Sequence, residues 1–137
     1  MSRPVLLVVA VLLAACSRGA SVGSPGGAPA AALLPAEVTP SNIALGDSLF
    51  NNGGCVRCHG PAGIGATNAP ALNDAQWLQL KTGAYDEIVG IITSGVPATA
   101  IKDPTHKNPM GARGGRMNLT DPQIKAVAAY VYSLSHK

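Results

Sequence analysis

The segment Cys55-Val56-Arg57-Cys58-His59 is the feature that most restricts what this chain can fold into. It places two thiols and one imidazole on five consecutive residues. The chain has three cysteines, and an odd number does not allow all of them to pair in disulfide bonds within the chain. We therefore interpret the segment as one that binds a group through its two thiols and the neighbouring imidazole.

Two cysteines separated by two residues and followed at once by histidine are typical of covalent haem attachment. The thiols of Cys55 and Cys58 would add to the two vinyl groups of haem, and His59 would present its imidazole to the iron. A structural zinc site needs four ligands, but the chain has no second cysteine pair, and His106 and His136 lack zinc-finger spacing. A thiol–disulfide redox pair shares the cysteine spacing, but usually in a fold with alternating strands and helices. We therefore predict one covalently bound haem c.

The N-terminus indicates export. A short apolar run from Pro4 to Ala15 follows Arg3, and it is too short for a membrane-spanning helix, which needs roughly 20 residues. The run is typical of a signal peptide. Leu13-Ala14-Ala15-Cys16 resembles the lipobox of bacterial lipoproteins, which implies removal of residues 1–15 and a lipid on Cys16. The alternative is plain secretion with a free thiol at Cys16.

Composition divides the rest of the chain. Residues 16–40 are rich in Gly, Ala, Ser and Pro and contain no aromatic residue, so we predict a flexible tether there. Residues 41–137 are then the folded domain. Aromatic residues make up only 4% of the whole chain, so its core needs further apolar bulk, which a haem would supply. A net charge of +3 is too small to indicate a nucleic-acid partner.

The apolar periodicity predicts helices and no strands. We expect a first helix over residues 41–51 capped by Ser41, a short helix around Trp77 that ends near Gly83, and a helix over residues 85–94. Residues 96–119 are expected to form a long ordered loop. A last helix follows the capping box that begins at Thr120. The expected fold is all-α, with three to five helices wrapped around one haem.

Residues 44–137 resemble a class I cytochrome c domain. The matching segments are 45–50, 54–60, 110–115, 118–121 and 129–134. The resemblance implies that the first and last helices cross near Gly46, where the missing side chain allows close approach. It also implies that Phe50 and Tyr130 pack at this crossing.

The same resemblance implies a methionine as the second axial ligand of the iron. Met110 precedes a glycine-rich turn, as the family ligand does, although the family commonly has Pro where this chain has Gly111. A His–Met pair closes both axial positions and raises the reduction potential. Met117 is the alternative to Met110. A third candidate is His106, which we expect instead to be a solvated loop residue.

Further residues are expected around the haem. The resemblance implies that the carbonyl of Pro70 accepts the other N–H of the His59 imidazole, which would fix the ring. Leu72 would cover a haem face. Trp77 and Tyr85 are expected to pack in the core, with contact to a haem propionate as the alternative.

These features predict an electron carrier rather than an enzyme. We expect a monohaem cytochrome on the periplasmic face of a bacterial membrane, anchored through Cys16, that passes single electrons between redox proteins such as a dehydrogenase, an oxidase or another cytochrome. The main alternative is an electron-accepting haem subunit of a larger dehydrogenase or oxidase. Two others are a ligand-binding haem sensor and a thiol-redox lipoprotein.

A loop rich in cations leads to the last helix. It carries Lys102, Lys107, Arg113 and Arg116 against the single carboxylate of Asp103. It is interpreted either as a basic rim that steers an acidic redox partner or as an ordinary solvated loop.

Overall fold

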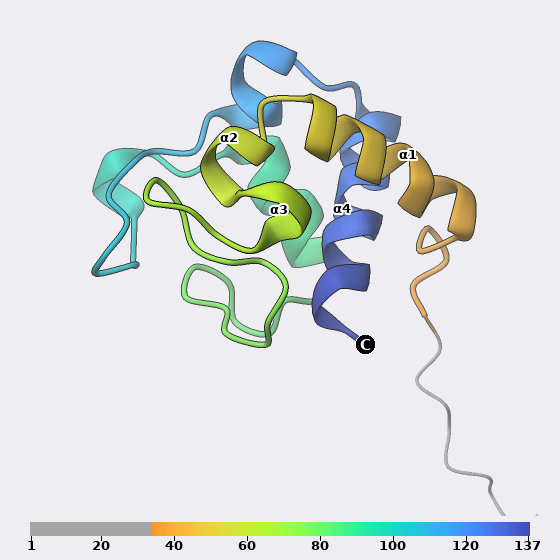
Figure 1. The fold of residues 1–137 in the computed structure, drawn as a ribbon, viewed down its shortest axis with the longest axis horizontal. Helices are drawn as coiled ribbons and strands as arrows, with labels where there is room; N and C mark the ends of the chain where they lie inside the picture. The colour runs from red at the N-terminus through yellow and green to blue at the C-terminus, as the bar shows by residue number, and fades with distance from the viewer. Residues whose placement is uncertain (1–33) are drawn as a thin grey trace, which may run out of the picture. The chain divides into compact units, whose positions relative to one another are not determined.

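The structure is a computed structural model that describes residues 34–137, so the predicted signal peptide, Cys16 and most of the predicted tether lie outside it. Within these residues no helix is long and apolar enough to cross a membrane. Residues 34–137 form four α-helices and three short 3₁₀ helices (Figure 1). In order they are α1 (Pro40–Asn52), α2 (Val56–His59), η1 (Pro61–Gly63), α3 (Tyr85–Ser94), η2 (Ala98–Ala100), η3 (Ala112–Met117) and α4 (Asp121–Ser135). The described part has no β-strand, only two isolated bridges, so the all-α prediction is confirmed.

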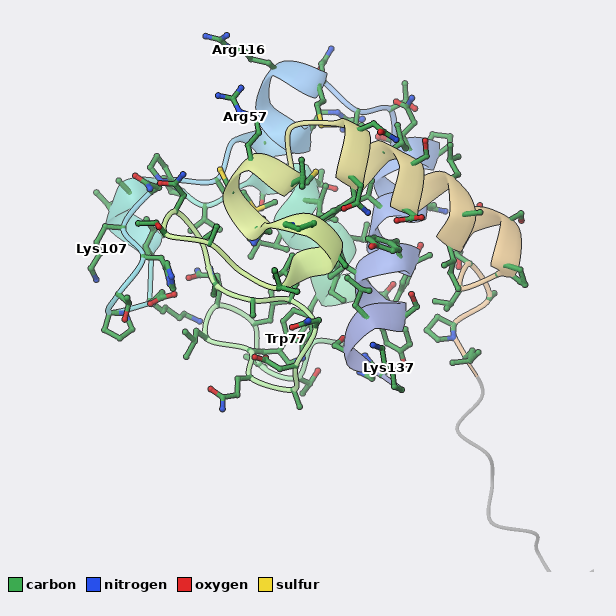
Figure 2. All side chains as sticks on the ribbon, in the orientation of Figure 1. Arg57, Trp77, Lys107, Arg116 and Lys137 are labelled. Carbon is green, nitrogen blue, oxygen red and sulfur yellow. The ribbon has the colours of Figure 1, made fainter. Side chains whose placement is uncertain are left out.

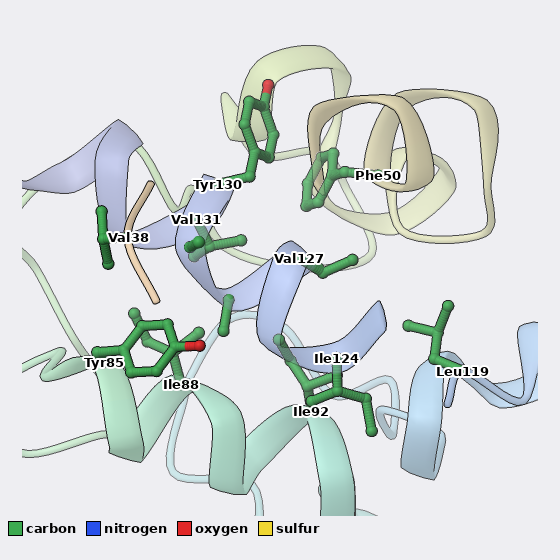
Figure 3. Close-up of a cluster of buried hydrophobic side chains, with 12 residues drawn as sticks. Val38, Phe50, Tyr85, Ile88, Ile92, Leu119, Ile124, Val127, Tyr130 and Val131 are labelled. Carbon is green, nitrogen blue, oxygen red and sulfur yellow. The ribbon is translucent and has the colours of Figure 1, made fainter. Parts of the chain in front are cut away.

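Helices α1 and α4 cross in direct contact (Figure 1). A Cβ atom on Gly46 would lie 2.0 Å from the carbonyl oxygen of Ala126 and 2.8 Å from Cβ of Tyr130, so only glycine fits at this point. Beside it, the rings of Phe50 and Tyr130 lie with their centroids 5.4 Å apart (Figure 3). The close approach near Gly46 and the aromatic pair agree with the arrangement that the resemblance implied.

The hydrophobic core lies where α4 packs between α1 and α3 (Figure 3). Helix α4 buries nearly its whole middle section, including Ile124, Val127 and Val131. From α3, Ile88 and Ile92 pack against it. Burial of such side chains contributes roughly 1.5–3 kcal/mol each, which orients α3 and α4 firmly relative to each other.

The folded part begins before residue 41. Val38 is only 8% exposed and belongs to the core, and Glu37 forms an ion pair of 3.1 Å with Lys125 of α4. Thr39, not Ser41, caps α1, since its hydroxyl accepts the backbone N–H of Asn42 at 3.2 Å. The prediction of Ser41 as the cap was wrong because Pro40 occupies the first helical position, which moves the cap back to Thr39.

The helix predicted around Trp77 does not form; the chain from 71 to 84 is irregular. Two sets of tertiary contacts hold this segment in its irregular conformation. The side chain of Gln79 bonds to Ala100 and Lys102 in the following loop at 3.0 Å each. The indole of Trp77 lies against Gly83, where a Cβ atom would be 2.0 Å from its Nε1 atom. These contacts hold the segment over the cavity described next.

Candidate haem site

A cavity of about 240 Å³, measured as the volume open to the centres of water molecules, lies beside the core. Core side chains from three helices form its inner wall, including Phe50 of α1, Ile88 of α3 and Val127 of α4. The loops over residues 68–80 and 96–115 form much of the remainder. The site is therefore an apolar space whose walls are continuous with the hydrophobic core.

Helix α2 presents the two cysteines and the histidine together. Cys55 stands at its N-terminus, and its carbonyl accepts the N–H groups of Cys58 at 3.1 Å and His59 at 2.9 Å. This single turn places all three side chains on the cavity. Both thiols are free in the structure; Cys58 is exposed and Cys55 is half-buried. Desolvation by burial raises the pKa of the Cys55 thiol.

The imidazole of His59 is held by the carbonyl of Pro70. The Nδ1 atom lies 3.0 Å from that oxygen, so this nitrogen carries the proton and donates it. The Nε2 atom then keeps its lone pair, which is the arrangement that suits a metal ligand. Burial lowers the pKa of His59 by desolvation, although the bond to Pro70 acts in the opposite direction. The imidazole is thereby favoured in the neutral form that binds metals.

Leu72 lies on the cavity wall near this histidine. Its backbone N–H donates to the carbonyl of Gly63 at 2.7 Å, which ties the segment after Pro70 to the turn after α2. The side chains of Pro70 and Leu72 both line the cavity. The carbonyl of Pro70 meets the imidazole as the resemblance implied, and the cover of a bound group by Leu72 stays a prediction.

The two candidate methionines differ in their surroundings. Met110 lines the cavity, and its backbone is fixed by two hydrogen bonds to Val96, at 2.9 and 2.8 Å. Met117 is not among the residues that line it; its Sδ atom accepts the N–H of Gly54 at 2.9 Å. Of the two methionines, Met110 is therefore the one that lines the cavity.

His106 differs from the solvated loop residue that was expected. It lines the cavity, its side chain is 23% exposed, and its Nδ1 atom lies 2.6 Å from Oδ2 of Asp103. Asp103 is itself only 4% exposed. The expectation was wrong because Asp103 turns the loop back on itself by accepting the N–H groups of Thr105 and His106 at 2.7 and 3.1 Å. The local sequence signal for such a turn is the aspartate itself, whose side chain readily accepts the N–H group two residues on.

The two aromatic candidates, Trp77 and Tyr85, also differ in whether they line the cavity. Trp77 lines the cavity. Tyr85 is not among the lining residues and is buried in the core, where its hydroxyl donates to the backbone carbonyl of Lys125 at 3.1 Å. Tyr85 is therefore a packing residue between α3 and α4.

Three of the four loop cations have partners. Lys102 donates to the carbonyl of Gln79 at 3.2 Å and Lys107 to that of Asp103 at 2.7 Å. Arg113 pairs with Asp121 at 2.5 Å. Arg116 has no such bond to the residues described, and its side chain projects outward (Figure 2). Among these four cations only Arg113 is paired with a carboxylate; Lys102 and Lys107 bond to neutral carbonyls and keep their positive charge.

The donor atoms of this cavity suit a haem. Residues 34–137 contain no cluster of three His, Cys, Asp or Glu side chains that could hold a metal ion alone. His59 and Met110 offer two donors, which suits an iron whose other ligands come from a macrocycle. Two thiols stand beside the histidine, and the apolar walls suit the macrocycle itself.

Comparison with known proteins points to one family. The Cytochrome c family profile matches residues 43–135. The chain is 38% identical over 110 residues to the Cbb3-type cytochrome c oxidase subunit FixP of Bradyrhizobium diazoefficiens, a match that covers 77% of this chain and 36% of that protein. It is 40% identical over 81 residues to FixP of Azorhizobium caulinodans, covering 59% and 26%. It thus spans about a third of the length of these curated relatives.

A solved structure shares the fold. Cytochrome cL from the marine methylotrophic bacterium Methylophaga aminisulfidivorans superimposes with a TM-score of 0.56 at 27% sequence identity. The match covers 73% of this chain and 60% of that one.

Proposed function

Because the chain belongs to the cytochrome c family, we propose that it carries single electrons between redox proteins on one covalently bound haem c. When bound, the haem supplies an iron that takes up and releases one electron. The observation that carries the proposal is the convergence of Cys55, Cys58, His59 and Met110 on one apolar cavity.

Five residues of the cavity have roles in this proposal. Cys55 and Cys58 would hold the haem through thioether bonds, and His59 and Met110 would each offer a donor atom to its iron. The carbonyl of Pro70 keeps the imidazole of His59 oriented and its Nδ1 protonated, which the 3.0 Å contact supports. Because His59 and Met110 would both bind the iron and are already held by the fold, electron transfer would require no ligand to enter or leave.

Whether the chain acts alone or as a subunit is a second question. The similarity to FixP, named as an oxidase subunit, supports an alternative in which this chain is the electron-accepting haem subunit of a larger complex. Native gel electrophoresis of detergent-solubilised membranes, stained for haem, separates the two cases. A small haem-stained band supports the independent carrier, and haem stain at the mass of a large oxidoreductase supports the subunit.

We propose further that the chain is exported, loses residues 1–15 and is held on the periplasmic face of a membrane by a lipid on Cys16. The short apolar run and the lipobox-like segment support this. Cys16→Ser should move the protein from the membrane fraction to the soluble periplasmic fraction. Retention of the variant in the membrane fraction would count against the anchor.

The haem assignment is tested on protein matured in a host that attaches haem c. Cys58→Ala should lose normal two-thioether attachment, seen as a shifted absorption spectrum of the reduced protein and weaker haem stain on a denaturing gel. A colourless wild-type protein with two titratable thiols would instead support a thiol-redox lipoprotein. Rapid binding of carbon monoxide by the wild type would support a haem sensor.

The axial ligand is tested by a matched pair. Met110→Ala should keep the haem, lower the reduction potential and open the iron to added ligands such as cyanide, because the second axial position is vacated. Met117→Ala should leave the ligation unchanged, since that sulfur contacts Gly54. The reverse result would make Met117 the ligand.

A further inference from the structure

The segment from Val96 to Met110 forms a loop closed at its base by the two backbone hydrogen bonds between these residues. Asp103 lies inside the loop, is buried, and accepts several hydrogen bonds from it. Its carboxylate accepts two backbone N–H groups and the imidazole of His106, and its carbonyl accepts the ammonium of Lys107. Desolvation raises the pKa of Asp103, but these hydrogen bonds outweigh it and the pKa is lowered, so the group is a carboxylate. The proposed electron transfer assigns no role to the pair formed by the Asp103 carboxylate and the His106 imidazole.

The cavity beside this pair has little positive charge. No Lys or Arg lines it, and its basic side chains are His59 and His106. His59 is occupied by its proposed bond to iron. A haem, however, brings two carboxylates with it, and a carboxylate removed from water is costly unless it finds a donor. His106 is thus the remaining basic group that can meet one of them.

Three of the four side-chain amides on the wall are already engaged, and the fourth, that of Gln76, is a neutral donor, as is the indole N–H of Trp77. Asn68 and Asn108 are hydrogen-bonded to each other at 3.0 Å, and Gln79 uses both ends of its amide on Ala100 and Lys102. By contrast, Nε2 of His106 makes no hydrogen bond to residues 34–137, although its Nδ1 is held by Asp103. The ring is therefore fixed in orientation and keeps one nitrogen for a ligand.

We propose that His106 binds a propionate carboxylate of the haem through Nε2–H, and that Asp103 is the positioning residue that holds the imidazole for this contact. The inference rests on the proposed function. With both ring nitrogens donating, the imidazole is a cation between two carboxylates, an arrangement in which charge-assisted hydrogen bonds are short and strong. It also offsets part of the negative charge that the cavity receives with the haem.

The test uses the full-length holoprotein and three variants, His106→Leu, His106→Gln and Asp103→Asn. Resonance Raman spectroscopy reports the propionate bending band, and spectroelectrochemistry at pH 7 reports the redox equilibrium. His106→Leu should shift the propionate band and lower the redox equilibrium constant threefold to tenfold, about 30–60 mV for one electron, because a cation near the haem favours the reduced iron. His106→Gln, which retains an N–H donor, should keep the propionate band close to its position in the wild type. Asp103→Asn should move the band part of the way towards that of His106→Leu.

The matched control is His136→Leu. His136 stacks on Tyr132 with centroids 3.9 Å apart and does not line this cavity, so neither measurement should change. An unchanged band and potential in His106→Leu would overturn the proposal. So would loss of the low-spin six-coordinate spectrum in that variant, because it would make His106 an axial ligand.

Two further outcomes keep the test decisive. If His106→Leu does not mature, proton NMR of the wild-type holoprotein decides: cross-relaxation between the His106 ring and a propionate methylene supports the contact, and its absence overturns it. If the wild type carries covalent haem and only the His106 results are negative, this inference fails while the electron-carrier function stands. A wild type without covalent haem would refute the proposed function itself.

Discussion

Gly46 is the residue on which the crossing of α1 and α4 depends. A Cβ atom at position 46 would lie 2.0 Å from the backbone carbonyl oxygen of Ala126. A change of side-chain rotamer cannot relieve this clash, so the two helices would have to move apart. Gly46→Ala should therefore lower the free energy of unfolding by about 3 kcal/mol, the upper range for overpacked cores. Urea unfolding of the holoprotein, followed by far-UV circular dichroism, measures this.

Gly90 provides the matched control for that substitution. It lies in α3, is exposed, and a Cβ atom there would meet nothing within 4 Å. Gly90→Ala should leave the protein unchanged or stabilise it by about 0.5–1 kcal/mol, because alanine is the better helix former. Equal losses in the two variants would mean that the crossing does not need the glycine.

Single residues also show where sequence reasoning ends. The spacing of Cys55, Cys58 and His59 is local, so their grouping on one helical turn could be predicted. Which methionine lines the cavity depends on tertiary contacts: Met110 lines it, whereas Met117 does not and accepts the N–H of Gly54. The pairing of His106 with Asp103 was missed because a short polar loop offers no periodicity that would distinguish a buried carboxylate from a solvated one.

At the scale of elements, α3 and α4 are joined by a hydrogen bond from Tyr85 to the carbonyl of Lys125. Burial of the tyrosine, with the nearby negative charges of Glu37 and Asp86, raises the pKa of Tyr85 to about 12. The neutral hydroxyl is thus favoured in the folded protein relative to the unfolded chain, whose tyrosines ionise near pH 10. The stabilisation is complete below pH 10 and is lost as the pH rises towards 12.

Tyr85→Phe tests this link. At pH 8 the variant should be less stable than the wild type by about 1 kcal/mol, the usual contribution of one hydrogen bond. Between pH 10 and 12 the difference should shrink, because only the wild type loses stability through this group. Urea unfolding at a series of pH values gives the difference directly, and other alkaline changes are common to both proteins. A difference that stays constant up to pH 12 would show that Tyr85 does not titrate this way.

The elements differ in how well their sequences determine them. Helices α3 and α4 carry periodic apolar residues, and α4 is capped by Thr120, whose N–H bonds to the side chain of Gln123 at 2.9 Å; both helices were predictable. The segment around Trp77 has apolar residues at helical spacing too. There, contacts with the loop after α3 compete with helical hydrogen bonds, and no local pattern reveals such distant partners.

At the scale of the whole molecule, the haem cavity is part of the core, since residues such as Phe50, Ile88 and Val127 belong to both. Emptying it would leave about 240 Å³ beside these side chains. At about 24 cal/mol per Å³ of cavity, the loss is about 6 kcal/mol, against a total stability of about 5–15 kcal/mol for a typical domain. The chain should therefore be marginally folded at best without its haem.

This is tested by expressing the full chain with Cys55→Ala and Cys58→Ala together, which prevents attachment. We expect loss of near-UV circular dichroism, binding of a hydrophobic dye and no cooperative thermal transition, the signs of a loosely packed state. Wild-type chain made without haem-attachment machinery should behave in the same way, because the haem and not the thiols fills the cavity. If either haem-free protein unfolds cooperatively at the temperature of the holoprotein, the polypeptide core alone determines the fold, and the contribution assigned to the cavity is wrong.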